Sequence, residues 1–478
     1  MTLHSFIADI EWVFLAYFIG INLGYLAQNV LAAIGMRRYL EVADQFEAEG
    51  VFSNLDLPIS IVVPAYNESV SIISSVRALL QLQYPQYELI VVNDGSTDDT
   101  LQKLIEAFSL RPFPEAYRAQ IACKPVHGIY RSARYPSLRV VDKENGGCKA
   151  DASNAGINAC RYPLVCVVDA DSILQPDSLR RVVRPFLEDP TTIAAGGTVR
   201  IANGCTLRRG FIERIGLPSN YLALVQVVEY LRAFLFGRLG WAFINSLLIV
   251  SGAFGVFRKD VLVDVGGFDP EAIGEDMELI VRMHRHMKKA RRAYRITFIP
   301  DPVSWTDAPE TLKGLQSQRV RWQHGLGQAL FANRALLFDR HGGSVAWLAM
   351  PFYLLFELFG PIVEVSGYLV IALAALAGWI YWPTALLFFA LAVMLGVLLS
   401  ASAIMLEELS FHMYPRTRNV LLLFGIAVVE NFGYRQLTAF WRLRGLVRWL
   451  YGRKQKWEAI TRTSLTEQTG LYRVETRD

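Results

Sequence analysis

Short apolar runs alternate with amphipathic stretches between residues 59 and 172. Four runs rich in Val and Ile, each ending in polar or glycine residues, occupy residues 59–66, 87–96, 137–144 and 163–172. Helix-like stretches lie between them at residues 69–82, 97–108 and 150–160. Strands that alternate with amphipathic helices predict an α/β fold, in which helices cover both faces of a mostly parallel sheet. We expect this soluble domain to occupy residues 58–340.

Long uncharged segments flank the predicted domain. Residues 12–36 carry no charge and are long enough for one tilted membrane helix. The basic pair Arg37-Arg38 follows this segment, which favours a membrane anchor over a signal peptide and predicts that residue 40 onward is cytoplasmic. Residues 365–406 also lack charge and predict two further spans, with a break near residues 378–384.

The borders of the second membrane region are less regular. Residues 350–364 are apolar but include Glu357 and Glu364, so they either begin a span or lie along the membrane surface. Residues 420–429 form a short apolar run between basic residues, which favours a re-entrant or interfacial element over a span. We expect three spans, and the basic stretch from Arg442 is expected to lie against anionic lipid.

The composition agrees with a membrane protein. Apolar residues make up 53% of the 478 residues, and the mean hydropathy of +0.27 is too high for a wholly soluble chain. The net charge of +4 does not favour binding to nucleic acid. The five cysteines form no CxxC pair, so the sequence indicates neither a zinc site nor a disulfide framework.

Polar residues gather where the predicted strands end. Asp169 and Asp171 follow an apolar strand, and two carboxylates so close together repel each other unless a cation lies between them. An Asp-x-Asp pair suits Mg²⁺ or Mn²⁺ shared with phosphate oxygens. The alternative is a solvated turn that caps the next helix.

Two further strand ends are expected at the same edge of the sheet. Asp94 can accept hydrogen bonds from a nucleobase or a ribose, and the glycine-rich turn before Lys149 offers amides and a cation to a phosphate. Because the carboxyl ends of parallel strands converge, these residues are expected to neighbour Asp169 and Asp171. Ordinary turns and helix caps are again the alternative.

Two later motifs offer further chemistry. Glu275 and Asp276 follow a glycine at a predicted helix start, where one carboxylate can act as a general base or simply favour the helix N-terminus. Gln318, Arg321 and Trp322 lie on one face of a predicted helix. Arg321 can bind a diphosphate and Trp322 can stack on a sugar ring. The same helix can also lie on the membrane surface.

Six ordered motifs, followed by membrane spans, resemble those of membrane-embedded family 2 glycosyltransferases such as cellulose, hyaluronan, poly-N-acetylglucosamine and chitooligosaccharide synthases. They are PAYNE (64–68), VVNDGSTDDT (91–100), GGCKADASNAG (146–156), DAD (169–171), GED (274–276) and QRVRW (318–322). The resemblance covers roughly residues 55–335. It implies a GT-A fold that uses a UDP-sugar and a divalent metal, Mg²⁺ or Mn²⁺.

The resemblance also implies roles for single residues. For the UDP-sugar it implies Tyr66, Glu68, Asp94, Lys149, Asp169, Asp171 and Arg321, with Asp169 and Asp171 also at the metal. For the acceptor it implies Gln318, Trp322 and the loop residues Gly252, Ala253 and Phe254, although a buried strand is the alternative for residues 251–258. Asp276, with Glu275 beside it, is the implied base.

The implied domain organisation has five regions. They are a transmembrane anchor (1–40), a cytoplasmic GT-A catalytic domain (55–310), interfacial helices with the QxxRW motif (311–345), C-terminal transmembrane helices (346–410), and an interfacial or re-entrant segment with a basic cytoplasmic tail (411–478). These regions place the chain in the cell (inner or plasma) membrane as a multi-pass protein. Its expected partners are membrane lipids, a polysaccharide or lipid acceptor, and accessory export subunits, and no nucleic acid.

The expected function is inverting, metal-dependent transfer from a UDP-sugar to a growing β-linked polysaccharide, processive and coupled to export. One alternative is transfer of a single sugar to a membrane lipid. The other is an inactive channel or scaffold subunit, and the intact carboxylates Asp169, Asp171 and Asp276 argue against it.

Overall fold

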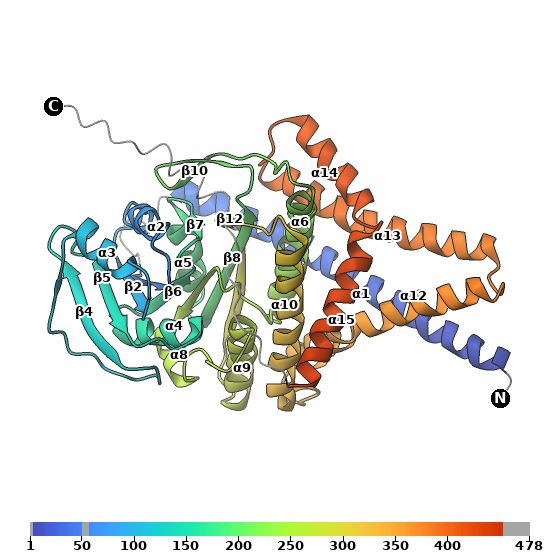
Figure 1. Ribbon diagram of the computed structural model, residues 1–478, viewed down its shortest axis with the longest axis horizontal. Coiled ribbons are helices and arrows are strands. Elements are labelled where there is room, and N and C mark those ends of the chain that lie inside the picture. The colour runs from blue at the N-terminus through green and yellow to red at the C-terminus, as the bar shows by residue number, and fades with distance from the viewer. Residues whose placement is uncertain (1–2, 50–56, 453–478) are drawn as a thin grey trace.

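The computed structural model describes residues 3–49 and 57–452, and within them the side chains of residues 12–42 and 57–452. A layered α/β domain lies at one end, and long helices extend from it at the other (Figure 1). Within the described residues, a ten-stranded sheet forms the centre of the domain. The order of its strands is β3 (Leu110–Pro112), β4 (Val126–Ser132), β5 (Leu138–Lys143), β2 (Tyr87–Asp94), β1 (Ile59–Ala65), β6 (Leu164–Val168), β11 (Phe254–Arg258), β8 (Thr192–Ile201), β12 (Arg295–Thr306) and β7 (Ile173–Leu174).

The predicted α/β class is confirmed, and the sheet is mixed. The four strands expected from the apolar runs are β1, β2, β5 and β6, and they form one parallel block in the order β5-β2-β1-β6. Strand β11 runs antiparallel to both β6 and β8, and β4 runs antiparallel to β5. The sheet order reverses at β1, because β2 lies on one side of it and β6 on the other. A crevice at the carboxyl ends of these strands is the usual ligand site in such sheets.

Helices cover both faces of the sheet, as the sequence predicts. One face carries α2 (Ile72–Leu79), α3 (Thr100–Phe108) and α5 (Ser178–Glu188), and the other carries α4 (Lys149–Ala159), α8 (Lys259–Asp264) and α9 (Glu275–Lys289). The side chains of β1 alternate between these layers: Val62 packs with α4, whereas Ile61 and Val63 pack on the opposite face. Gly156 lets α4 approach closely, because a Cβ there would lie 2.3 Å from a methyl of Val62.

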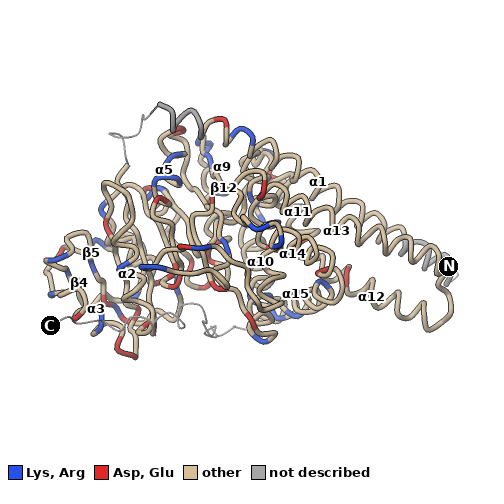
Figure 2. Tube along the Cα trace, turned by 90° about the horizontal axis from the view of Figure 1, so that it is seen from above, with Lys and Arg blue, Asp and Glu red and all other residues tan. Residues whose placement is uncertain are grey.

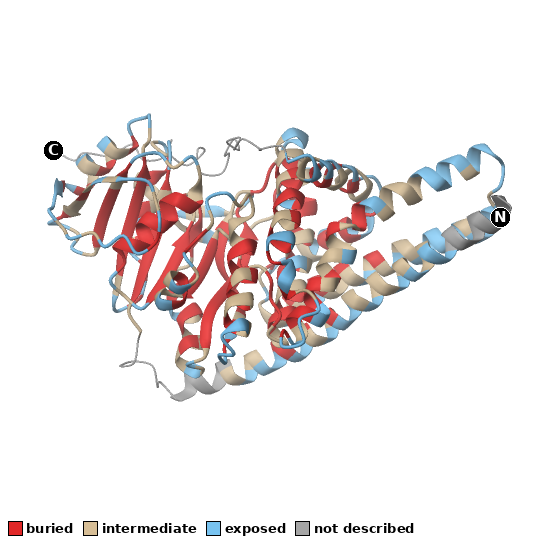
Figure 3. Ribbon diagram, turned by 90° about the horizontal axis from the view of Figure 1, so that it is seen from below, coloured by how far each residue is buried: buried red, intermediate tan, exposed pale blue. Residues whose placement is uncertain are grey.

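A further layer of helices separates the sheet from the membrane helices (Figure 1). It consists of α6 (Tyr221–Leu231), the π-helix η2 (Arg232–Arg238), α7 (Leu239–Phe243) and α10 (Leu312–Ala332). The sequence predicts no helix for residues 221–243, because this segment is almost continuously apolar and shows no helical period. Buried residues colour this layer and the sheet red in Figure 3.

The apolar segments form long helices. They are α1 (Leu3–Glu49), α12 (Gly360–Leu376), α13 (Trp382–Ser410), α14 (Thr417–Val429) and α15 (Tyr434–Leu450). By length and composition, three helical stretches can cross a membrane: Trp12–Val42, Val345–Leu376 and Trp382–Ser410. Figure 2 shows few charged residues along the outer parts of α1, α12 and α13.

The candidate spans number three, as expected, or four if α14 and α15 form one broken span. Residues 350–364 belong to the second candidate span, through η4 (Val345–Ala349), α11 (Met350–Phe352) and η5 (Tyr353–Leu358). The fourth segment is α14, which meets α15 at a bend of 60°, as in a broken span or a re-entrant loop. The remaining described elements are the hairpin β9 (Thr206–Arg208) and β10 (Phe211–Arg214), and the short helix η3 (Arg334–Leu336).

Two ion pairs with a buried glutamate connect the α/β domain and the interfacial layer to the membrane helices: Arg200 with Glu407, and Arg232 with Glu430. A third pair, Arg442 with Glu357, joins α15 to η5 and is half-buried. The sequence predicts that Glu357, Glu364 and Glu430 avoid lipid, and Glu430 is fully buried against Arg232, Arg435 and Ser400. Charges at this depth are stable only when they are paired.

Arg442, where the basic stretch expected at the lipid begins, binds protein groups instead. Arg442 belongs to α15, and its guanidinium donates to Gln323 Oε1 of α10 at 3.0 Å and to the Glu357 carbonyl at 2.6 Å. Tyr25 of α1 donates to the same glutamate at 2.6 Å. The partner of Arg442 is distant in the sequence, so local charge alone pointed to lipid. Residues 453–478 of the predicted basic tail lie outside the described residues.

The pair Arg200–Glu407 provides a test of this connection. We expect Glu407→Gln to lower the free energy of unfolding by about 3–5 kcal/mol, because it leaves Arg200 buried without a counter-charge. The neighbouring Glu408→Gln is the matched control and should change it by less than about 0.5 kcal/mol, because the partner His412 is 74% exposed. Denaturant unfolding of the detergent-solubilised protein measures both. Equal losses in the two variants would contradict the expectation.

Candidate functional site

The loops that follow β1 and β2 are joined into one unit. The Asn67 amide donates to Ser96 Oγ at 3.1 Å, and the Glu68 amide donates to Thr100 Oγ1 at 2.9 Å. Tyr66 is exposed at the end of β1. The Glu68 carboxylate accepts a hydrogen bond from Ser71 at 2.8 Å, so this glutamate also supports the start of α2. The first two predicted motifs therefore meet at the crevice of the sheet.

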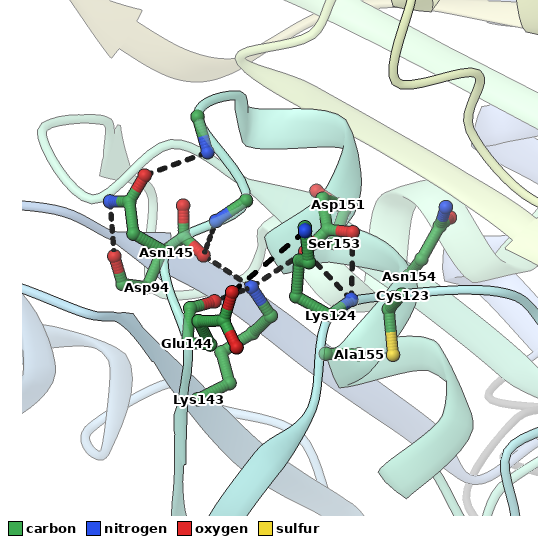
Figure 4. A network of polar contacts seen from close by, with 12 residues as sticks. Asp94, Cys123, Lys124, Lys143, Glu144, Asn145, Asp151, Ser153, Asn154 and Ala155 are labelled. Atoms are coloured by element: carbon green, nitrogen blue, oxygen red, sulfur yellow. Dashed lines mark hydrogen bonds and ion pairs between the residues drawn. The ribbon is translucent and has the colours of Figure 1, made fainter.

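Asp94 lies in a buried polar network at the end of β2 (Figure 4). Its Oδ1 accepts hydrogen bonds from Lys143 Nζ at 2.5 Å and from the Gly146 amide at 3.0 Å. Lys143 also pairs with Asp151 at 2.6 Å. Burial works against the charge of Lys143, but the two carboxylates outweigh it and raise its pKa. This network fixes the glycine-rich turn, while Asp94 Oδ2 accepts no hydrogen bond from the described part of the chain.

A second network joins four segments that are distant in the sequence. Lys149, the first residue of α4, pairs with Asp169 Oδ1 at the end of β6. The same ammonium donates to the Gly252 carbonyl at 2.6 Å. The Gly252 amide in turn donates to Asp276 Oδ2 at 3.1 Å, in the first turn of α9. The two networks share the turn of residues 146–149, since Gly146 binds Asp94 and Lys149 binds Asp169.

The charges of the second network influence one another. Burial opposes the charge of Lys149, but Asp169, Glu275 and Asp276 outweigh it and raise its pKa. Burial and the neighbouring charge of Asp276 raise the pKa of Glu275 to about 7, and Lys149 partly counters this. Lys149 thus supplies part of the positive charge that the paired aspartates require.

Asp169 and Asp171 fit a divalent cation that is shared with a phosphate. The side chain of Asp169 is 36% exposed, and Asp171 is half-buried in the turn that follows. The described residues contain no group of three or more His, Cys, Asp or Glu that could enclose a metal. Mg²⁺ commonly takes one or two carboxylates and completes its shell with phosphate oxygens and water. The donor set therefore suits Mg²⁺ or Mn²⁺ with a phosphorylated ligand.

The QxxRW motif lies on α10, and a glycine contact directs it toward α9. A Cβ on Gly325 would lie 2.8 Å from the Gly274 amide, immediately before Glu275. Positions 318, 321, 322 and 325 share one helix face, so the motif is oriented toward the start of α9. Gln318 is buried with no partner for its Oε1 within the described residues. Trp322 is 44% exposed and is stacked by Arg319 at 4.5 Å.

One predicted acceptor residue is misplaced. Phe254 is fully buried in β11, so the alternative of a buried strand is correct for Phe254–Arg258 and the side chain cannot contact an acceptor. Gly252 and Ala253 precede the strand in the half-buried loop beside Asp276. Apolar and polar residues do not alternate in residues 254–258, because both faces of this central strand are buried, so the sequence gives no clear strand pattern here.

Comparisons with known proteins identify glycosyltransferases among the relatives of this chain. Residues 60–266 match the family model "Glycosyl transferase family 2", and residues 164–400 match "Glycosyl transferase family group 2". Among curated relatives, a poly-β-1,6-N-acetyl-D-glucosamine synthase of Staphylococcus epidermidis is 29% identical over 267 residues, which are 56% of this chain and 54% of that protein. The same synthase of Staphylococcus aureus (strain COL) is 30% identical over 269 residues, again 56% and 54%.

The chain thus spans about half the length of the curated relatives that it matches. Among solved structures, it aligns with a mannosyltransferase of Pyrobaculum calidifontis in complex with GDP-mannose and Mn²⁺. The TM-score is 0.48 at 17% identity, and the alignment covers 92% of this chain and 99% of that one.

The contact between Gly274 and Gly325 leads to a first prediction for this site. Gly325→Ala should lower the free energy of unfolding by about 1–3 kcal/mol, because the new methyl group meets backbone atoms that cannot turn aside. Gly425→Ala is the control: nothing lies within 4 Å of its Cβ position in α14, so alanine should be neutral or stabilising by up to about 1 kcal/mol. Thermal unfolding compares the two variants, and equal stabilities would refute the close contact.

The raised pKa of Glu275 leads to a second prediction. A folded-state pKa of about 7 lies above the usual value of 4.5, so the folded protein binds more protons than the unfolded chain between these pH values. The free energy of unfolding should therefore fall as the pH rises through this interval. Glu275→Gln removes the titration, so its stability relative to wild type should increase from pH 5 to pH 8. Melting temperatures at several pH values test this. A difference in melting temperature between variant and wild type that stays constant with pH would contradict it.

Proposed function

Because this chain belongs to glycosyltransferase family 2, we propose that it moves a sugar from a UDP-sugar to the growing end of a β-linked polysaccharide. The chain is a glycosyltransferase with a GT-A-type α/β domain joined to apolar helices of membrane-span length. The carrying observation is the chain of contacts from Asp169 through Lys149 and Gly252 to Asp276. In this chain of contacts Lys149, a candidate phosphate ligand, binds the Gly252 carbonyl, and Asp276, the candidate base, binds the Gly252 amide.

The donor would bind in the crevice at the carboxyl ends of β1, β2 and β6. The ring of Tyr66 is exposed for stacking, and Asp94 Oδ2 is available to accept a hydrogen bond from the base or ribose. Glu68 lies on the same joined loops. The diphosphate would meet Lys149 and, on the α10 side, Arg321.

A divalent ion would be held by Asp169 and Asp171. When bound, it would neutralise charge that develops on the departing UDP. Lys149 prepares the site by keeping Asp169 oriented through a direct ion pair. The same ammonium group would also contact the diphosphate. It would thus pair with the Asp169 carboxylate before the donor binds and with a phosphate afterwards.

Asp276 is the proposed general base. The Gly252 amide holds its Oδ2 at 3.1 Å, and the Met277 amide holds its Oδ1 at 2.8 Å, so the carboxylate has a fixed orientation. It would accept the proton of the acceptor hydroxyl while that oxygen attacks the anomeric carbon, the bond to UDP breaks, and the configuration inverts from α to β. Glu275 would act electrostatically through its deprotonated form, whose charge Lys149 partly balances.

A polysaccharide product is supported by the curated relatives and by the position of α10. Gln318 and Trp322 would hold the acceptor end, with Gly252 and Ala253 opposite. Because α10 packs on α15 and binds η5 through Gln323, transfer next to the bilayer favours processive synthesis coupled to export. The proposal places the protein in the cell membrane as a multi-pass enzyme with a cytoplasmic catalytic domain, associated with lipids and accessory export subunits.

Product analysis tests this proposal. We expect purified protein, given a panel of labelled UDP-sugars, to release UDP and place label in a polymer. Asp276→Asn should slow both by about 100- to 10,000-fold, because the base is lost. The control Asp264→Asn, with a side chain that is 50% exposed on α8, should keep the rate. Label confined to a monoglycosylated lipid would instead support transfer to a lipid acceptor, and wild-type protein without UDP release would refute enzyme activity.

Metal removal gives a separate prediction. Chelation should slow transfer by about 100-fold or more, and added Mg²⁺ or Mn²⁺ should restore it, because the ion supplies several kcal/mol of charge stabilisation. Asp169→Asn and Asp171→Asn should raise the metal concentration needed for half-maximal rate. Asp177→Asn, in the next exposed turn, should not. Full activity after exhaustive chelation would remove the metal from the proposed mechanism.

A further inference from the structure

Arg238 is a half-buried cation of the interfacial layer, and no carboxylate of the described residues forms an ion pair with it. It ends the π-helix η2, and its guanidinium carbon lies 3.7 Å from the centre of the Phe234 ring. Its Nη1 is fully buried and has no hydrogen-bond partner within the described residues. Among the other buried and half-buried arginines, five pair with glutamates: Arg139, Arg200, Arg232, Arg319 and Arg442.

The unpaired guanidinium is energetically costly. Burial lowers the pKa of Arg238 to about 10, although the nearby carboxylate of Asp276 opposes this shift. A buried cation without a counter-ion destabilises a fold, and such groups are typically retained at functional sites. The π-helical turn supports this reading, because such turns occur frequently at functional sites.

The neighbours of Arg238 connect the two halves of the candidate site. Tyr230, Phe234 and Arg238 are spaced four residues apart, and the first two rings lie 5.6 Å between centres. Tyr230 is half-buried and lies within the electrostatic influence of Arg321, in the QxxRW motif. Arg238 lies within that of Asp276. The aromatic and cationic stripe on α6 and η2 therefore lies within the electrostatic reach of both the QxxRW motif and the proposed base.

We propose that Arg238 and Tyr230 form a subsite for the acceptor sugar on the membrane side of Asp276. The guanidinium donates hydrogen bonds to hydroxyl or acetamido oxygens, and the tyrosine ring packs against a pyranose. This inference rests on the proposed function. Because one guanidinium face is covered by Phe234, the donors that remain point outward in its plane, which suits sugar oxygens.

A neutral ligand fits this subsite better than a phosphate. The Asp276 carboxylate acts on the same region and would repel an anion. The diphosphate of the donor already has Lys149 and the proposed metal on the opposite side of Gly252. A sugar has no charge to be repelled, and its oxygens can accept hydrogen bonds from the half-buried guanidinium.

The experiment compares Arg238→Met with Arg232→Met, six residues earlier on η2, where the guanidinium pairs with Glu430. Three quantities are measured in the full-length protein: UDP affinity, melting temperature, and sugar incorporated per UDP released, with β-linked N-acetylglucosamine oligosaccharides as the added acceptor. Arg238→Met should lower the incorporation ratio at least five-fold, because donor would be hydrolysed instead of transferred. Its UDP affinity should stay within two-fold, and its melting temperature should not fall.

Two controls separate a ligand role from a structural one. Arg238→Lys keeps the charge but not the planar donor set, so it should restore the ratio only in part. Arg232→Met should lower the melting temperature and leave the ratio of the remaining active protein unchanged. An unchanged ratio in Arg238→Met overturns the subsite, as does a loss of UDP affinity or a melting temperature as low as that of Arg232→Met. Wild-type protein that transfers no sugar overturns the proposed function together with this inference.

Discussion

The ion pair between Lys149 and Asp169 is the interaction on which the candidate site depends. It connects the start of α4 to the end of β6, and the same ammonium binds the backbone at Gly252, which positions Asp276. The site is therefore not assembled from four independent loops. One side chain sets the distance between the region suited to a diphosphate and the region suited to a base. Any change in α4 that moves Lys149 would displace both regions together.

The interfacial layer holds this arrangement against the candidate membrane helices. Helix α10 contacts the start of α9 through Gly325 and the candidate second span through Gln323, so one helix touches both the candidate site and a candidate membrane segment. The π-helix η2, in the same layer, carries Arg232, which is paired with Glu430, and Arg238, which has no ion pair among the described residues. Paired charges fix the position of the layer, and the unpaired one is left for a ligand. The same layer thus combines anchoring with recognition.

Sequence reasoning predicted the parts of the site that local patterns and parallel topology determine. Asp169 and Lys149 end or follow strands of one parallel block, so their proximity follows from the topology. Phe254 was misassigned because a strand buried on both faces shows no alternation. Arg442 and Lys143 were misjudged or overlooked because their partners, Glu357 and Asp94, lie far away in the sequence. Arg238 was hidden in an apolar run, where only the absence of a partner marks it.

The packing of α15 on α10 has a consequence for biogenesis. Gly445 lies against the backbone of Val320, and Tyr434 and Arg442 bind groups on or beside α10. Ribosomes deliver α15 long after the catalytic domain, and domains fold as they emerge. Until then the helix that carries the QxxRW motif has one side without its neighbour. The nascent enzyme would therefore remain incomplete beside the translocation machinery, and sugar transfer would begin only after membrane insertion has placed α15.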